Sequence, residues 1–187
     1  MNNLVISNIM NRRSTRSFKE EQITRFELDA ILQCGLNAPS AYNNQSWYFT
    51  VVQNQILLNE INEEVRKIII NSGDERRSNM AKQEGYNIFH NAPTVIFVSM
   101  EKDEPFTQTN CAMAIENMLL AAESQDVGSC VIGLVRLAFE GERRDYLLEK
   151  LDIARAVYDP LCAVSFGYKL GISLPRDRLP NKVNFIR

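Results

Sequence analysis

Most of the residues that could do chemistry in this 187-residue chain are arginines in two separate groups. Arg12, Arg13 and Arg16 precede the first long apolar pattern, and Arg176 and Arg178 lie near the end of the sequence. Guanidinium groups match phosphate oxygens in charge and geometry, so two converging groups could hold one phosphate dianion. Each group could equally be a solvated surface patch, because charged runs usually remain in water.

A polar loop between the two groups offers a second kind of chemistry. Residues 38–47 read APSAYNNQSW and carry short hydroxyl and amide side chains. Such side chains can donate and accept hydrogen bonds at the edge of a flat heterocycle. A Ser- and Asn-rich segment also serves as an ordinary turn between a helix and a strand. Composition alone leaves both interpretations open.

Few other side chains offer catalysis or metal binding. His90 is the only histidine, and a structural or surface role is its ordinary interpretation. The four cysteines stand singly among apolar residues, without metal-like spacing or a disulfide pattern: Cys34, Cys111, Cys130 and Cys162. We therefore expect no metal site and a reducing, cytoplasmic environment. An enzyme with so few acids and bases must take its reactivity from a cofactor.

The composition argues against two classes of partner. Lys and Arg number 21 against 23 Asp and Glu, so overall charge gives no reason to expect nucleic acid or a membrane. No apolar run approaches bilayer length, and the first residues lack the pattern of a signal peptide, so we expect a protein that is not exported. The hydrophobic content of 45% can build one core, which predicts a single domain over residues 1–187.

The apolar spacing predicts the elements that would position these residues. Helices are expected over residues 3–11, from the capping box of Thr24 and Glu27 to Pro39, and over 56–70, 109–124 and 140–151. Strands are expected over 47–52, 94–100 and 161–168, with a short strand or turn over 129–134. Residues 72–87 stay unassigned as a lid, a loop or a short helix. Without regular βαβ alternation, this mixture predicts an α+β fold.

Several motifs in order resemble one known family. Residues 12–18, RRSTRSF, are similar to the opening motif of the nitroreductase family of FMN enzymes, and residues 38–47 are similar to the loop after the family's second helix. The later motifs follow in the family's order: 91–93 before a strand, the small-residue helix 112–122, 130–133, 166–168 and 174–178. Each motif is weak alone, but together they extend over nearly the whole chain, which is identified as a member of the family.

The resemblance implies an architecture. The family fold is a three-layer α+β sandwich, with a central mixed, mostly antiparallel sheet flanked by helices. It works as a homodimer with FMN at the subunit interface, and the extended C-terminal tail, here residues 170–187, reaches the partner. The helix over 111–122 suits that interface, although burial within its own subunit is the alternative.

The resemblance also implies roles for individual residues. The ribityl phosphate would be held by Arg12, Ser14, Arg176 and Arg178, with Arg13 close by. Arg16 would face the pyrimidine edge of the flavin, where a cation stabilises the negative charge of the reduced ring.

The remaining implied contacts surround the ring. Side chains of Ser40, Asn43 and Gln45 would bond its polar rim. The backbone of Ile132 and Gly133 would approach N5, although many relatives have an acidic residue in place of Ile132. Phe106 would flank the flavin, since the longer insertion of larger relatives is missing here; cover must otherwise come from residues 72–90.

The activity that the resemblance implies is hydride transfer. NADH or NADPH would reduce FMN, which would then reduce a small organic acceptor such as a nitroaromatic or a quinone in a ping-pong mechanism. The alternatives are a specialised enzyme of the same fold, either a reductive dehalogenase or a flavin-destroying enzyme, or a non-catalytic FMN-binding module.

Overall fold

The centre of the molecule is a four-stranded antiparallel sheet. The computed structural model describes residues 3–171 and 173–187. The strands are β1 (Trp47–Val52), β2 (Thr94–Glu101), β3 (Val127–Ile132) and β4 (Tyr158–Tyr168), in the order β1-β2-β4-β3. The first six residues of β2 are all buried, which confirms the expected strand in the middle of the sheet. A single parallel bridge, Ser14 to Ser129, supplies the mixed character.

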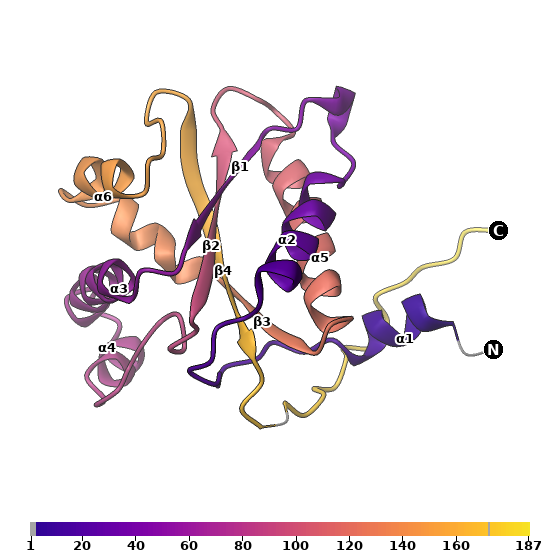
Figure 1. The fold of residues 1–187 in the computed structure, drawn as a ribbon, viewed down its shortest axis with the longest axis horizontal. Coiled ribbons are helices and arrows are strands. Elements are labelled where there is room, and N and C mark those ends of the chain that lie inside the picture. The colour runs from indigo at the N-terminus through magenta and orange to yellow at the C-terminus, as the bar shows by residue number, and fades with distance from the viewer. Residues whose placement is uncertain (1–2, 172) are drawn as a thin grey trace.

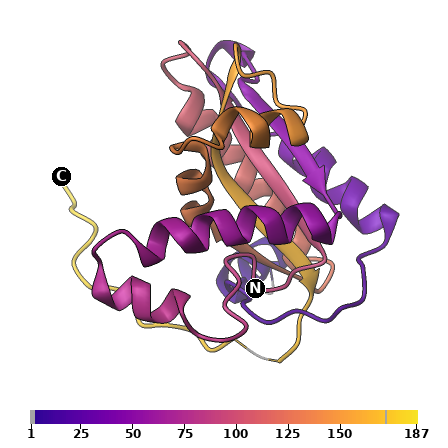
Figure 2. The same ribbon diagram turned by 90° about the vertical axis from the view of Figure 1, so that its left-hand side faces the viewer.

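Helices cover both faces of this sheet, giving the three layers visible in Figure 1. One face carries α2 (Arg25–Leu36) and α5 (Thr107–Glu123). The other carries α3 (Gln55–Ile70), α6 (Arg144–Lys150) and a 3-10 helix over Gly133–Phe139. The short α4 (Glu75–Ala81) lies beside α3, as Figure 2 shows. The α+β class and the sandwich are therefore as expected, with a separate apolar core on each side of the sheet.

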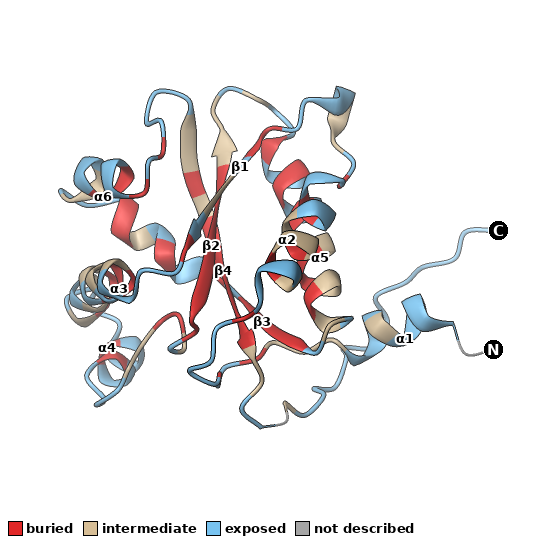
Figure 3. Ribbon diagram, in the orientation of Figure 1, coloured by how far each residue is buried: buried red, intermediate tan, exposed pale blue. Residues whose placement is uncertain are grey.

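Two terminal segments lie outside the sandwich. The helix α1 (Leu4–Asn11) has no buried residue, and most residues of the tail from 173 onward are exposed (Figure 3). The accessible surface is 11923 Å² for a mass of 21.4 kDa. A compact monomer of this mass exposes roughly 9,100 Å². The terminal segments thus leave uncovered surface of the kind that a partner chain would bury.

The second helix begins as its sequence predicts. The Thr24 hydroxyl accepts a hydrogen bond from the Glu27 N–H at 3.2 Å, and the Glu27 carboxylate accepts one from the Thr24 N–H at 2.7 Å. The Tyr168 hydroxyl donates to the same carboxylate at 2.8 Å, which ties α2 to the end of β4. The helix ends at Leu36, before Pro39, and its Gly35 lets α5 approach closely: a Cβ there would lie 2.7 Å from Met118.

The region after β3 differs most from expectation. The short strand or turn expected over 129–134 is a strand that begins at Val127 and ends at Ile132. A 3-10 helix follows immediately, because its apolar residues recur every three positions and are buried at Val135 and Ala138. The helix expected over 140–151 was partly wrong, since residues 140–143 form a polar turn and α6 begins only at Arg144. The unassigned segment 72–87 contains α4.

Candidate functional site

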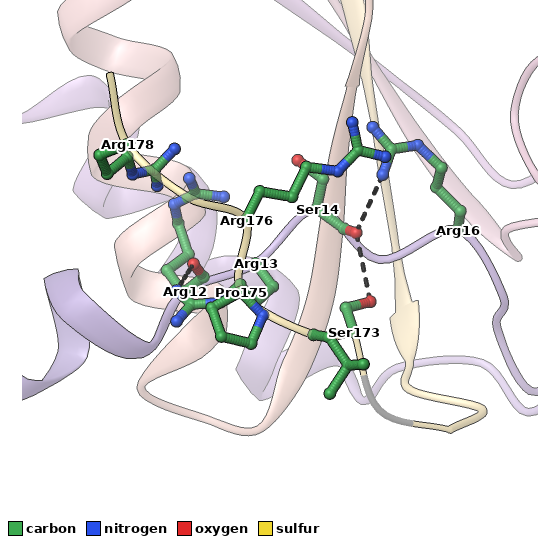
Figure 4. Close-up of a pocket in the computed structure, with 9 residues that line it drawn as sticks. Arg12, Arg13, Ser14, Arg16, Ser173, Pro175, Arg176 and Arg178 are labelled. Atoms are coloured by element: carbon green, nitrogen blue, oxygen red, sulfur yellow. Dashed lines mark hydrogen bonds between the residues drawn. The ribbon is translucent and has the colours of Figure 1, made fainter. Parts of the chain in front are cut away.

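The two arginine groups that the sequence singled out meet in one cavity. This cavity has a volume of about 570 Å³. Figure 4 shows the side chains that line it converging from two segments: the chain that follows α1 and the C-terminal tail. From the first come Arg12, Arg13, Ser14 and Arg16, and from the second Ser173, Leu174, Pro175, Arg176 and Arg178.

The edge of the sheet holds the first segment in place. Ser14 forms its bridge to Ser129 on β3, and the Thr15 N–H donates to the Ser129 carbonyl at 2.8 Å. Gly128 makes this approach possible, because a Cβ at that position would lie 2.8 Å from the Thr15 hydroxyl oxygen. Further along, the Lys19 N–H donates to the Tyr168 carbonyl at 2.9 Å. The backbone that carries the arginines is thus an added edge of the sheet.

The tail approaches this segment through a side-chain contact. The Ser173 hydroxyl donates to the Ser14 carbonyl at 3.3 Å. Two residues later, the ring of Pro175 restricts the backbone of the tail. Arg176 and Arg178 are exposed, and within the described ranges neither side chain has a hydrogen bond or an ion pair. Their guanidinium groups are therefore available to a ligand.

Charge in the cavity is strongly positive. Five guanidinium groups line it, and the carboxylate nearest to them is that of Glu116, 3.9 Å from Arg12 Nε in a partly exposed pair. Arg13 donates to the carbonyls of Met10 and Arg12, both at 2.7 Å, and so closes the end of α1. Arg16 makes only a 3.5 Å contact with the Ser14 carbonyl. Such an arrangement favours an anion with several oxygens, above all a phosphate dianion.

The polar loop 38–47 is clamped to the first turns of α5. The amide of Asn110, which is 1% exposed, accepts from the Ala41 N–H at 3.0 Å and donates to the Ser46 hydroxyl at 2.9 Å. The Ser40 hydroxyl accepts from the Gln45 N–H at 3.0 Å. Asn43 and Gln45 both have a positive φ, of 57° and 49°. The loop is held in an unusual backbone conformation rather than left as a free turn.

Sequence reasoning missed the residues that build this clamp. Besides Asn110, the Thr107 hydroxyl donates to the Ser46 carbonyl at 3.0 Å, and both side chains are buried. The only signal was the presence of polar residues on the apolar face of a helix. Phe106, predicted to flank a flavin, lies at the start of α5, with its ring centroid 6.3 Å from that of Tyr42.

Within one chain, the loop and the arginine cavity lie at different levels of α5. The loop contacts Asn110, whereas Arg12 pairs with Glu116 and Asn8 donates to the Leu120 carbonyl. A helix rises about 1.5 Å per residue, which separates the two levels by roughly 9 to 15 Å along the axis. Figure 1 shows α1 and the loop before β1 at opposite ends of α5. Within one chain, the polar loop and the arginine cavity are therefore separate.

The turn after β3 lies at the end of the strand that anchors the arginine segment. The Ile132 side chain is 5% exposed and packs in the core, which leaves only its backbone to approach a ligand. A Cβ on Gly133 would have no atom within 4 Å, so there is open space above this residue. An acidic side chain at position 132 would have to be accommodated in the apolar core.

Burial favours the protonated form of three of the four thiols. Burial raises the pKa of the Cys111 thiol to about 11 and that of Cys162 to about 12, and it also raises the pKa of Cys130. A protonated thiol is a poor nucleophile. Over residues 3–171 and 173–187, no cluster of His, Cys, Asp and Glu could hold a metal ion, and no helix is long and apolar enough to cross a membrane.

Comparisons with known proteins identify the family of the chain. The family model described as Nitroreductase family matches residues 9–168. The crystal structure of a nitroreductase with bound FMN from Bacteroides fragilis superimposes with a TM-score of 0.90, at 30% sequence identity, covering 99% of this chain and all of that one.

Two curated relatives also match. An FMN reductase (NADPH) of Bacillus subtilis is 25% identical over an alignment of 201 positions, gaps included, that covers 97% of this chain and 72% of the relative. An iodotyrosine deiodinase of Thermotoga neapolitana is 29% identical over 129 residues, 63% of this chain and 67% of the relative. The family match includes β1 to β4 and the arginine segment after α1. The chain belongs to the nitroreductase family.

Proposed function

We propose that this protein is an FMN-dependent oxidoreductase that takes hydride from NADH or NADPH and passes electrons to an oxidised organic acceptor. The observation that carries the proposal is the cavity in which the tail arginines meet those after α1. FMN, when bound, supplies hydride acceptance and donation at its N5 atom. The FMN-bound structure from Bacteroides fragilis supports the choice of cofactor.

The cavity residues suit the terminal phosphate of FMN. Arg12, Ser14, Arg176 and Arg178 would bind its oxygens, since a dianion with three oxygens can take several charge-assisted hydrogen bonds. Arg16 has only a weak protein contact and would lie along the pyrimidine edge. There its charge would favour the reduced ring, which carries additional negative charge.

A second copy of the chain would complete the site. Two copies of α5 packed antiparallel about a two-fold axis would bring the Ser40–Gln45 loop of one chain level with the arginine cavity of the other. Ser40, Asn43 and Gln45 of the loop would then meet the rim of the ring. The exposed apolar residues of α1 and the tail, such as Leu4 at 84% and Ile186 at 93%, support burial against a partner.

The turn after β3 would limit access to the reacting atom. The backbone of Ile132 and Gly133 would lie beside N5, and the space above Gly133 would admit a flat ring.

The name of the Bacillus subtilis relative supports a nicotinamide donor. The acceptor would be a small oxidised organic molecule, such as a nitroaromatic or a quinone, reduced in a second half-reaction after the nicotinamide has left.

Reductive dehalogenation is a second candidate because of the iodotyrosine deiodinase relative. A halogenated phenol would need cover on the open side of the flavin. Either α4 or Phe106, which is 45% exposed, would have to supply this cover. Release of iodide from iodotyrosine by the dithionite-reduced protein, at a rate faster than quinone reduction, would favour this candidate.

A visible spectrum tests the proposal directly. The purified protein should be yellow, release FMN and no FAD on denaturation, and lose its flavin absorbance when titrated anaerobically with NADH or NADPH. An added quinone should restore the absorbance. Release of FAD, or a colourless protein that cannot be reconstituted with FMN, would refute the cofactor. A yellow protein that neither nicotinamide bleaches would point to a binding module without this activity.

A further inference from the structure

His90 lies in a turn whose backbone is fixed from several sides. Its N–H donates to the Asn87 carbonyl at 3.0 Å. The carbonyl of the preceding Phe89, which is 1% exposed, accepts from the Ser165 hydroxyl at 3.0 Å. His90 and Asn91 both have a positive φ, of 57° and 56°. Residues other than glycine seldom adopt this conformation, and such residues are concentrated at functional sites. The turn therefore fixes the backbone that carries the imidazole.

The contacts of this turn connect His90 to the strand pair beside which Arg16 lies. Ser165, which holds the turn, pairs with Cys130 across β4 and β3. The neighbour of Cys130, Ser129, accepts the Thr15 N–H, so Arg16 follows directly beside the same strand. The positive charge of Arg16 adds to the burial that lowers the pKa of His90, and it opposes the burial that raises the pKa of Cys130. The Arg16 segment and the His90 turn are thus attached to neighbouring residue pairs of β3 and β4, Ser129–Phe166 and Cys130–Ser165.

The surroundings of His90 keep its ring neutral and available. Burial, and then the charge of Arg16, lower its pKa. The Cys130 thiol on β3 is uncharged because burial raises its pKa, and Ser165 on β4 does not titrate. In the part of the chain that the structure describes, neither ring nitrogen of His90 has a hydrogen-bond partner. A partly buried polar group without a partner is suited to a ligand or a proton.

We propose that His90 takes up a proton when bound FMN is reduced and releases it when FMN is reoxidised. The proposal rests on the proposed function, in which Arg16 faces the pyrimidine edge. Negative charge gained beside Arg16 would offset the repulsion that this arginine exerts on a protonated imidazole. The two electrons arrive with the hydride of the nicotinamide, and the proton comes from water and returns to water. His90 would thereby neutralise part of the charge of the reduced site.

The chain has a single histidine, which makes a direct titration possible. The FMN-loaded protein, labelled at the histidine ring and carrying no histidine tag, would be followed by NMR against pH, first oxidised and then reduced with dithionite. On reduction, the acid dissociation constant of His90 should fall about tenfold, which is a rise of about one unit in its pKa. An unchanged constant in a yellow, reducible protein would overturn this inference alone. A protein that binds no FMN would overturn it together with the proposed function.

A variant distinguishes proton uptake from a structural role. Asn tolerates positive φ, so His90→Asn should keep the turn while removing the titration. His90 has one pKa in the oxidised protein and a higher one in the reduced protein. Between these two values, the midpoint potential of the flavin should fall more steeply with pH in the parent protein than in His90→Asn. Cys130→Ala is the matched control, because it changes a side chain in the same neighbourhood and keeps His90. The pH dependence of its midpoint potential should follow that of the parent protein. Identical profiles for His90→Asn and the parent would also overturn the inference.

Discussion

At the scale of single residues, the cavity divides its arginines into anchored and free groups. Arg13 uses its guanidinium on the carbonyls of Met10 and Arg12, so it closes a helix. Arg178 is exposed, and its side chain has no hydrogen bond or ion pair with any residue whose placement is described. Removing Arg13 should therefore disturb the structure as well as binding, whereas removing Arg178 should affect binding alone.

Arg178→Ala should weaken FMN binding and leave the fold intact. A hydrogen bond to a charged group contributes about 1.5 to 3 kcal/mol, so the dissociation constant should rise roughly tenfold to a hundredfold. Quenching of FMN fluorescence on binding measures this constant. Arg76→Ala removes another exposed arginine, outside the cavity, and should bind like the parent. Equal affinity of both variants would mean that the tail arginines do not bind phosphate.

The sequence predicted which arginines could bind phosphate, but not which of them is used to close a helix. Guanidinium groups are recognisable as phosphate ligands wherever they occur, which is why both groups could be named in advance. Whether one of them caps a helix depends on where that helix ends, as Arg13 illustrates. The clamp formed by Asn110 was likewise invisible, because its partners Ala41 and Ser46 lie more than sixty residues away.

At the scale of elements, the arginine segment depends on close packing against β3. Gly128 and Thr15 touch at the point where this segment joins the sheet. The contact leaves no room for a methyl group on Gly128. The position of Ser14 and Arg16 is therefore coupled to a strand residue that contacts no ligand.

Gly128→Ala should weaken FMN binding through this contact. The new Cβ would lie 2.8 to 2.9 Å from three atoms of Thr15, forcing the segment away from β3. Overpacking of this kind typically costs about 1 to 3 kcal/mol, so both the melting temperature and the FMN affinity should fall. Gly141→Ala is the control, since its nearest neighbour is Ile68 at 4.0 Å. An unchanged affinity in Gly128→Ala would show that the segment does not need this packing.

Elements with a strong local signal could be predicted, and those stabilised by context could not. The capping box of Thr24 and Glu27 and the buried strand β2 each carry their pattern in consecutive residues. The 3-10 helix over Gly133–Phe139 and the short α4 would have little stability as isolated helices, and both depend on packing against α3. Strand order had no local signature, because it depends on which distant strands pair.

At the scale of the whole molecule, the terminal segments expose apolar surface that the proposed dimer would bury. The apolar side chains of α1 and the tail are exposed in a single chain, including Val5 at 67% and Phe185 at 75%. The polar loop and the arginine cavity lie at different levels of α5. Both observations have one explanation if the functional unit is a dimer.

The full chain should be a dimer in solution, and removing residues 173–187 should weaken both the dimer and FMN binding. The truncation takes away apolar tail surface together with Arg176 and Arg178. Light scattering at micromolar concentration, with FMN content measured on the same sample, checks this. A stable monomer of the full chain that retains FMN would contradict a site shared between chains.

Mixed dimers test the shared site most directly. One chain would carry Arg12→Ala and Arg178→Ala, and the other Ser40→Ala and Asn43→Ala. Each dimer of identical variants should bind FMN weakly. If the cavity of one chain works with the loop of its partner, the mixed dimer contains one intact site and should bind about one FMN with the affinity of the parent. If each site lies within one chain, both sites of the mixed dimer are damaged, and the absence of tight binding would contradict the account.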